Sequence, residues 1–203
     1  MLDSVRRSRS ILPILLVSFC VAAQEPEAAL KALVTTGEIT VRGQTRQYIV
    51  RHLPPSSFPD LPDTVANELN QRGCLIPQTY QAHQPENAVH GNFQRAGSSD
   101  WAVLCSVKGT VSLLVFFDSS AKPSVLASAH ETQRLQVHES NGVLGFDWGI
   151  GAASPQAIHD AQIGVSPRPP RADHDALSDS VVDRKTIYRY FANGSWSQLD
   201  MPD

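Results

Sequence analysis

The stretch Trp101-Ala-Val-Leu-Cys-Ser-Val-Lys-Gly-Thr-Val-Ser-Leu-Leu-Val-Phe-Phe117 decides how this chain folds. It is the longest strand-like apolar run in the sequence, and its β-branched and aromatic side chains suit a pleated, half-buried surface. Lys108-Gly109 divides the run in two and places a glycine where a tight turn needs positive φ. The stretch therefore predicts a β-hairpin with strands at 101–107 and 110–117.

The second of these strands is expected to be covered on both faces. Residues 113–117 are apolar without alternation, which is the pattern of a fully buried strand. A buried helix is the alternative for such a run. The serine and threonine content and the tight Lys108-Gly109 link favour the strand.

Residues 1–23 have the pattern of a secretory signal peptide. Three arginines near the start precede an apolar run over 11–23 that is too short to span a bilayer, and small residues end it. We expect cleavage before Gln24, with an uncleaved N-terminal anchor as the alternative. The mature chain, 24–203, is then exported, periplasmic or secreted, and has no stable membrane span.

The charge balance argues against nucleic acid or anionic lipid as the partner. The full chain has a formal net charge of −3, and loss of the arginine-rich leader makes the remainder more acidic. The chain also contains no basic run.

Two cysteines remain once Cys20 leaves with the leader, and they predict one structural disulfide, Cys74 to Cys105. An even pair in an oxidising compartment is typical of a disulfide. On the chain-entropy model the bridge stabilises the fold by about 3–4 kcal/mol. Two distant thiols supply too few soft ligands for zinc.

The mature chain is predicted to be a single α+β domain, mainly antiparallel sheet with one or two short helices. Its length fits one domain. Four consecutive segments divide it, each described by its expected structure. They are a first hairpin and proline-rich loop (34–59), a disulfide-pinned helix and central sheet (60–140), a Gly/Pro-rich and acidic connection (141–184), and a C-terminal hairpin (185–203).

The helix of the second segment is expected to start at a capping residue, Asp60 or Asp63, and to run to about Gln71. One of its faces carries apolar side chains at i, i+4 spacing: Leu61, Val65 and Leu69. Gly73 suits the left-handed position that ends a helix, and Cys74 follows at once. The disulfide would therefore fix the helix to the central hairpin.

The other elements follow from alternation and turn residues. Strands are expected at 38–42, 47–51, 88–93, 125–132, 134–138, 185–191 and 195–199. Asn193-Gly194 is a strong signal for the last hairpin turn. Ser154-Pro155 is a good helix start. Gly149 and Gly151 before it lack a third glycine, so we expect a plain turn and no dinucleotide site there.

Asp173-His174-Asp175 and the following Asp179 are the best candidate site in the sequence. A helix would align Asp175, Asp179 and Asp183 on one face. Clustered carboxylates can hold calcium, or zinc if His174 contributes. The alternative is a solvated acidic loop that leads into the last hairpin.

Established catalytic motifs are missing from the sequence, which contains neither H-E-x-x-H nor G-x-S-x-G. Glu131 and Glu139 could form a carboxylate pair on strands, although surface charge explains them more simply. The tryptophans and tyrosines could form a sugar- or peptide-binding face, but such residues more often fill a core.

Several fragments together resemble an uncharacterised group of exported bacterial proteins. They are Arg72-Gly-Cys-Leu-Ile-Pro-Gln78, Asn87 to Phe93, Asp100-Trp-Ala-Val-Leu-Cys-Ser106, Asp173-His-Asp175 and Tyr190 to Leu199. The likeness extends over roughly residues 60 to 200, and the cysteine-bearing fragments are its most specific part. It implies export and a shared fold, and it supplies no catalytic residues.

The sequence thus predicts an exported, non-catalytic binding or envelope-associated protein, whose partner is a peptide, a glycan or another exported protein. The alternative is a metal-assisted hydrolase that uses Asp173, His174 and Asp175.

Overall fold

The computed structural model describes residues 33–138 and 142–202, and the predicted signal peptide lies outside them. The fold is α+β, with mostly antiparallel sheets, two short helices and the predicted disulfide. None of the helices in the described part of the chain has the length and apolarity that a membrane crossing demands.

The central hairpin forms as predicted, within a four-stranded antiparallel sheet. Lys108 and Gly109 make its turn, both with positive φ, and Trp101 pairs with Phe116 at the open end. The strands of this sheet, in spatial order, are β4 (Ala88–Gly91), β5 (Asp100–Val107), β6 (Thr110–Phe116) and β7 (Ser124–His130). Short 3-10 turns end β6 and β7 earlier than predicted: η2 (Phe117–Ser119) and η3 (Glu131–Gln133).

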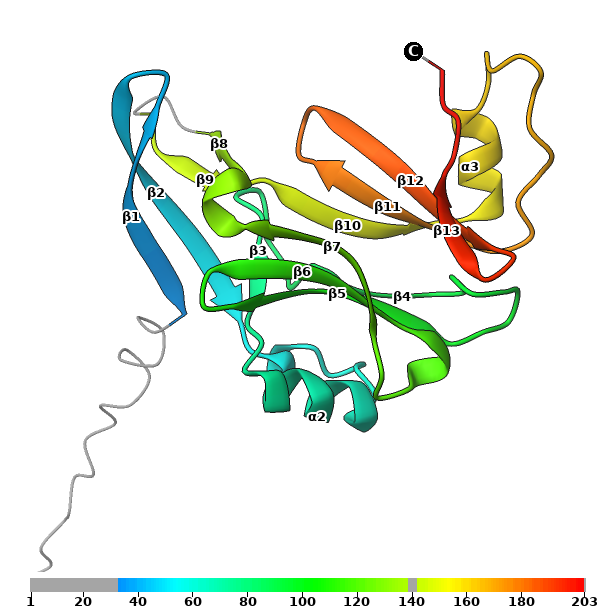
Figure 1. The fold of residues 1–203 in the computed structure, drawn as a ribbon, viewed down its shortest axis with the longest axis horizontal. Coiled ribbons are helices and arrows are strands. Elements are labelled where there is room, and N and C mark those ends of the chain that lie inside the picture. The colour runs from blue at the N-terminus through cyan, green and yellow to red at the C-terminus, as the bar shows by residue number, and fades with distance from the viewer. Residues whose placement is uncertain (1–32, 139–141, 203) are drawn as a thin grey trace, which may run out of the picture.

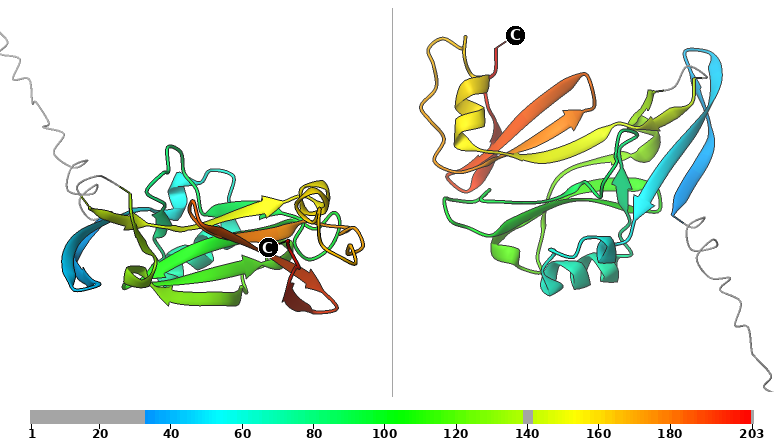
Figure 2. Two further views of the ribbon diagram at one scale, coloured as in Figure 1. Left: turned by 90° about the horizontal axis from the view of Figure 1, so that it is seen from above. Right: turned by 180° about the vertical axis from the view of Figure 1, so that it is seen from behind.

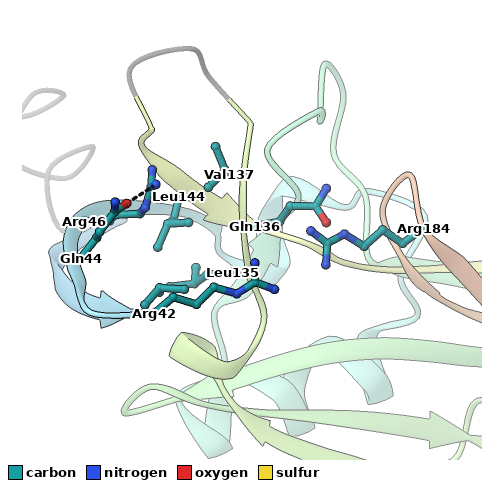
Figure 3. Close-up of a pocket in the computed structure, with 9 residues that line it drawn as sticks. Arg42, Gln44, Arg46, Leu135, Gln136, Val137, Leu144 and Arg184 are labelled. Atoms are coloured by element: carbon teal, nitrogen blue, oxygen red, sulfur yellow. Dashed lines mark hydrogen bonds between the residues drawn. The ribbon is translucent and has the colours of Figure 1, made fainter.

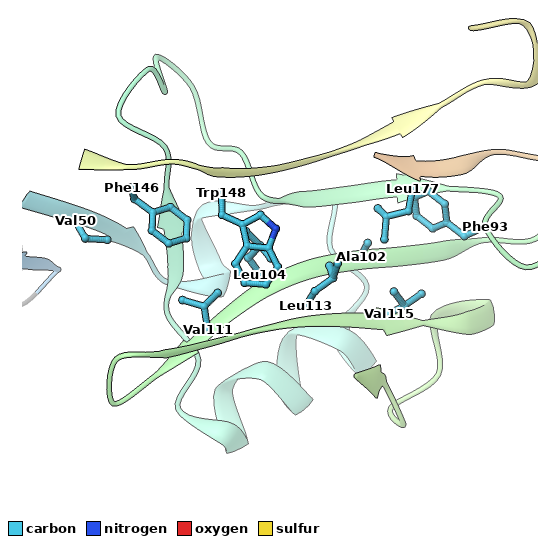
Figure 4. Packing of buried hydrophobic residues seen from close by; sticks show 10 residues of the cluster. All are labelled: Val50, Phe93, Ala102, Leu104, Val111, Leu113, Val115, Phe146, Trp148 and Leu177. Atoms are coloured by element: carbon cyan, nitrogen blue, oxygen red, sulfur yellow. The ribbon is translucent and has the colours of Figure 1, made fainter. Parts of the chain in front are cut away.

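Both faces of this hairpin are buried, as its lack of alternation predicts. Consecutive residues of a strand point to opposite faces of the sheet. Here the side chains on each face belong to a separate buried cluster. One cluster, drawn in Figure 4, consists of Val50, Phe93, Ala102, Leu104, Val111, Leu113, Val115, Phe146, Trp148 and Leu177. The other consists of Leu61, Val65, Leu69, Cys74, Ile76, Trp101, Val103, Cys105, Leu114 and Phe116.

Helix α2 (Asp63–Arg72) covers the second face through Val65 and Leu69, both fully buried. It follows Pro62, and no side chain caps its first turn, so the predicted capping by Asp60 or Asp63 is wrong. The end of the helix is as predicted, because Gly73 adopts the left-handed conformation with φ of 70°. The disulfide Cys74–Cys105 then ties the chain to β5, with the two Cα atoms 5.1 Å apart.

A second sheet contains the first hairpin and the two short strands that follow η3. Its order is β1 (Val34–Val41), β2 (Gln44–Leu53), β9 (Leu144–Phe146) and β8 (Leu135–Val137), with β3 (Ile76–Gln78) paired to β2. Strands β2 and β9 run parallel, and the other pairs are antiparallel. The hairpin turn is Arg42-Gly43, tighter than the predicted turn at 43–46.

The third sheet is antiparallel and ends in the predicted Asn193-Gly194 hairpin. Its order is β10 (Trp148–Ala153), β11 (Ala176–Val181), β12 (Lys185–Ala192) and β13 (Ser195–Gln198). Gly149 and Gly151 lie inside β10, so the turn predicted there is wrong. The Ser178 hydroxyl lies close to Gly151, so a side chain at this position would require the hydroxyl to move. Helix α3 (Pro155–Ala161) starts as predicted, with the Ser154 hydroxyl accepting from the Ala157 amide.

The three sheets lie side by side around the first cluster. Figure 1 shows the β1–β2 ribbon at one end of the molecule, and α3 and the C-terminus at the other. Helix α2 lies on the outer side of the central sheet, and the views in Figure 2 agree with this arrangement. A short 3-10 turn, η1 (Pro55–Ser57), connects β2 to the approach of α2.

Candidate anion-binding site

The predicted acidic site does not form a helical face. Residues Ala176–Val181 are strand β11, so the helix that would align Asp175, Asp179 and Asp183 is absent. Each of these carboxylates is directed to partners of its own. Asp175 accepts from the Asn92 amide at 2.9 Å.

Asp179 lies inside β11 and is buried. It accepts from Trp148 Nε1 at 2.7 Å and from the Arg189 guanidinium at 2.7 and 2.9 Å. Because both of its oxygens are engaged, Asp179 serves to join β10, β11 and β12.

Asp173 and His174 do come together, and Tyr190 of β12 joins them. The Tyr190 hydroxyl donates to Asp173 Oδ1 at 2.6 Å, and His174 Nδ1 lies 2.6 Å from the same oxygen. His174 Nε2 lies 2.9 Å from the Phe191 carbonyl oxygen, which can only accept. The hydrogen bonds from Tyr190 and His174 hold the pKa of Asp173 below its usual range. Burial and the bond to Asp173 raise the pKa of Tyr190.

No group of three or more His, Cys, Asp or Glu side chains among residues 33–138 and 142–202 is placed to hold a metal ion. A hollow of about 540 Å³ does adjoin Asp173 and His174, with Arg95 and Arg171 in its lining. Arg95 is paired with Asp118 at 3.1 Å, so charges of both signs are present there.

A different hollow, of about 310 Å³, gathers positive charge alone. Figure 3 shows it between the β1–β2 turn, strand β8 and the β11–β12 turn. Its lining contains three arginines and no carboxylate: Val41, Arg42, Gln44, Arg46, Leu135, Gln136, Val137, Leu144 and Arg184. In a chain of net charge −3 this local excess is a property of the site and not of the whole surface.

Two of the three guanidinium groups have no internal partner, and the third, that of Arg46, is only partly engaged. Arg46 donates to Gln44 Oε1 at 2.8 Å and to the Gly142 carbonyl at 3.3 Å. Neither the Arg42 nor the Arg184 guanidinium has a hydrogen bond or an ion pair within the part of the chain that the structure describes. Each guanidinium offers five N–H donors in a planar fork that fits a carboxylate or a phosphate.

The floor of this hollow is apolar and continues the molecular core. Val137 pairs with Leu144 and Leu135 pairs with Phe146, so these side chains share one face of the sheet. Phe146 belongs to the first buried cluster, and Leu135 packs against it. Val137 remains 46% exposed, so the open part of the floor is accessible to a ligand.

Polar groups beside the hollow are arranged around Gln136. Its Nε2 donates to the Tyr80 hydroxyl at 2.9 Å, while its Oε1 is buried with no hydrogen-bond partner among the described residues. Figure 3 shows the Gln136 amide near the Arg184 side chain. Tyr80 donates in turn to Asp183 at 3.0 Å. Burial and this hydrogen bond raise the pKa of Tyr80.

Asp147 is a second buried polar group in this region. Its side chain is nearly buried, and Oδ1 has no hydrogen-bond partner among the described residues. Burial raises the pKa of Asp147, and the positive charges of Arg134 and Arg184 offset this only in part. Arg134 also lies over the Trp148 ring, 4.1 Å from its centroid.

A buried acid–base cluster lies elsewhere, between β2, β5 and η3. His52 Nε2 is 2.8 Å from Glu131 Oε1, and the Ser106 hydroxyl donates to the same oxygen. All three side chains are almost fully buried. The serine hydroxyl meets the carboxylate and not the imidazole, so this is not the arrangement of a nucleophilic triad. Burial tends to raise the pKa of Glu131, but the bonds from His52 and Ser106 prevail and lower it.

Sequence reasoning missed both the buried cluster of His52, Ser106 and Glu131 and the arginine-lined hollow. Glu131 was expected on a strand as surface charge, which is wrong, because it is 3% exposed and begins η3. Its expected partner, Glu139, lies outside the described residues. Trp101 and Trp148 are core residues, so the core interpretation of these two aromatics is confirmed. The one available signal for the hollow was the pair Arg42 and Arg46 around a hairpin turn.

Comparison of the chain with protein-family models, with curated proteins and with solved structures gives no match.

Proposed function

We propose that this chain is an exported, non-catalytic binding protein that holds an anionic ligand in the arginine-lined hollow. The observation that carries the proposal is that Arg42, Arg46 and Arg184 line one hollow together with apolar side chains and no carboxylate. Hydrogen bonds between a guanidinium and an ionised oxygen are about twice as strong as neutral ones. The floor would accommodate the apolar part of an organic anion.

Export is supported by the leader-like pattern of residues 1–23 and by the Cys74–Cys105 disulfide. Disulfides persist in oxidising compartments. A binding role is supported by the paired state of the acidic groups elsewhere, since Asp173, Asp175 and Asp179 all bond to other parts of the fold.

The test is isothermal titration of residues 24–203 with glutarate, citrate and inorganic phosphate. We expect saturable binding of at least one carboxylate, weakened at high ionic strength because the arginines are accessible to solvent. Arg42→Ala and Arg184→Ala should each weaken binding about tenfold or more, the effect of losing one charge-assisted hydrogen bond.

Lys122→Ala is the matched control, because it removes one exposed positive charge outside the hollow. It should leave affinity unchanged within about twofold if the hollow and not net charge is responsible. Binding that is equally weakened by Lys122→Ala, or no binding of any of the three anions, would contradict the proposal.

A further inference from the structure

The hollow lies along an open strand edge. Strand β8 is the last strand of its sheet, with β9 on one side only among the described strands. Consecutive residues of a strand point to opposite faces. Leu135, Gln136 and Val137 all line the hollow, so residues from both faces of β8 border it, on a strand whose other edge is paired with β9.

The register fixes which backbone groups face outward. The Asp147 amide donates to the Arg134 carbonyl at 2.9 Å, and the His138 amide donates to the Val143 carbonyl at 3.4 Å. In an antiparallel pair, hydrogen-bonded positions alternate along the strand. Positions 134, 136 and 138 therefore bond towards β9, and the N–H and C=O groups of Leu135 and Val137 point away from it.

These four groups have no hydrogen bond to any described residue. An edge with unpaired groups is a template for an added strand, and main-chain bonds supply the affinity when an extended peptide binds there. Here the template is flanked by two arginines whose guanidinium groups have no hydrogen bond or ion pair among the described residues, Arg42 and Arg184. The charge selects an acidic occupant.

We infer that the ligand of the hollow is an extended acidic peptide that adds an antiparallel strand to the free edge of β8. This inference rests on the proposed anion-binding function. Peptide residues opposite Leu135 and Val137 bond to them through N–H and C=O, and their side chains lie on the same face as Leu135 and Val137. Arg46 lies on this face as well. It pairs with Ile39 on β1 and stands two positions before Tyr48 on β2, and Tyr48 pairs with Leu144 of β9. Acidic side chains are therefore expected at every second peptide residue.

The test uses a fluorescein-labelled peptide of alternating Thr and Glu with capped ends, measured by fluorescence anisotropy against the intact chain. Two further peptides carry N-methyl groups, one on the glutamates and one on the threonines. N-methylation removes an N–H donor and keeps the side chains. We expect methylation of the glutamates to weaken binding by about tenfold or more, and methylation of the threonines to change it less than about twofold.

Two outcomes separate this inference from the function on which it depends. Equal affinity of the two methylated peptides, with glutarate still bound in an Arg42-dependent manner, overturns strand addition and leaves the anion-binding function standing. Failure of both glutarate and the unmethylated peptide to bind overturns both. Selective loss with the methylated glutamates supports strand addition to β8.

Discussion

Glu131 is the buried charge that joins three separate segments, since it accepts from His52 of β2 and Ser106 of β5 while beginning η3. Loss of the carboxylate removes the ionised acceptor of two buried hydrogen bonds, and such bonds to a charged group are the stronger kind. Glu131→Gln should therefore lower the free energy of unfolding at neutral pH by about 3 kcal/mol. Urea unfolding measures this, with the exposed Glu38→Gln as the control expected to change little.

The pH dependence of this effect has a definite sign. The folded-state pKa of Glu131 is lowered, so its stabilisation is present above the ordinary glutamate pKa of about 4.3 and is lost as pH falls through the folded value. The difference between the wild-type chain and Glu131→Gln should shrink as the pH is lowered through this window. A difference that is constant with pH would contradict the assignment.

Asp147 should behave in the opposite way. Burial raises the pKa of Asp147 in the folded state above its value in the unfolded chain. As pH rises from the unfolded-state pKa through the folded-state pKa, ionisation of this carboxyl therefore lowers the free energy of unfolding. Asp147→Asn should thus gain stability relative to the wild-type chain as pH rises from acid to neutral. Thermal unfolding across this range measures it, and a relative loss at neutral pH would show that Arg134 and Arg184 outweigh burial.

Single residues of the resembling fragments have structural partners that the sequence could not reveal. Asn87 donates to the Pro77 and Trp148 carbonyls and accepts from the Ile150 amide, and so connects β3, β4 and β10. Asp100, fully buried, accepts from the Gln94 and Asp118 amides. Such contacts join segments far apart in sequence, which local patterns do not encode.

Among the elements, the disulfide is the clearest attachment of α2 to the central sheet. Replacing Cys74 and Cys105 with Ser together should lower the free energy of unfolding by about 3–4 kcal/mol and the Tm by about 10 °C. Calorimetry with and without reductant measures this. Reductant should bring the wild-type Tm down to that of the double variant and leave the variant itself unchanged. Equal Tm values for the wild-type chain and the double variant under oxidising conditions would contradict a stabilising role of the disulfide.

The acidic segment before β11 is expected to be indifferent to metal. Both ring nitrogens of His174 already face Asp173 and the Phe191 carbonyl, and Asp175 and Asp179 have separate partners. Added Ca²⁺ or Zn²⁺ should therefore leave the Tm unchanged, because an ion that binds the native state would raise it. A metal-dependent rise in Tm of several degrees that is lost in Asp173→Ala would contradict this expectation and support a metal site at this segment.

Elements with strong local signals were predictable from the sequence. The Lys108-Gly109 and Asn193-Gly194 hairpins, the glycine end of α2 and the Ser154 cap all form as predicted. Predictions failed where tertiary packing overrides local chemistry. Gly149 and Gly151 indicated a turn, but they belong to a strand that is closely approached by β11. The spacing of Asp175 and Asp179 fitted a helix, but the segment pairs as a strand.

At the scale of the whole molecule, the arginine-lined hollow exists only because distant segments meet. Arg42 and Arg46 belong to the first hairpin, Leu135 and Val137 to β8, and Arg184 to the turn before β12. The parallel contact of β2 with β9 brings the first two segments together. No periodicity in the sequence predicts that contact, so the site could not be found before the fold was known.

The most direct measurement is a ¹H–¹⁵N NMR titration of residues 24–203 with glutarate, following the backbone amides and the arginine Nε–H groups. We predict the largest shifts at Arg42 and Arg184 and at the amides of Leu135 and Val137, with the Asp173 and His174 region unaffected. Shifts concentrated around Asp173 and His174, or spread over all exposed cations including Lys122, would contradict the account.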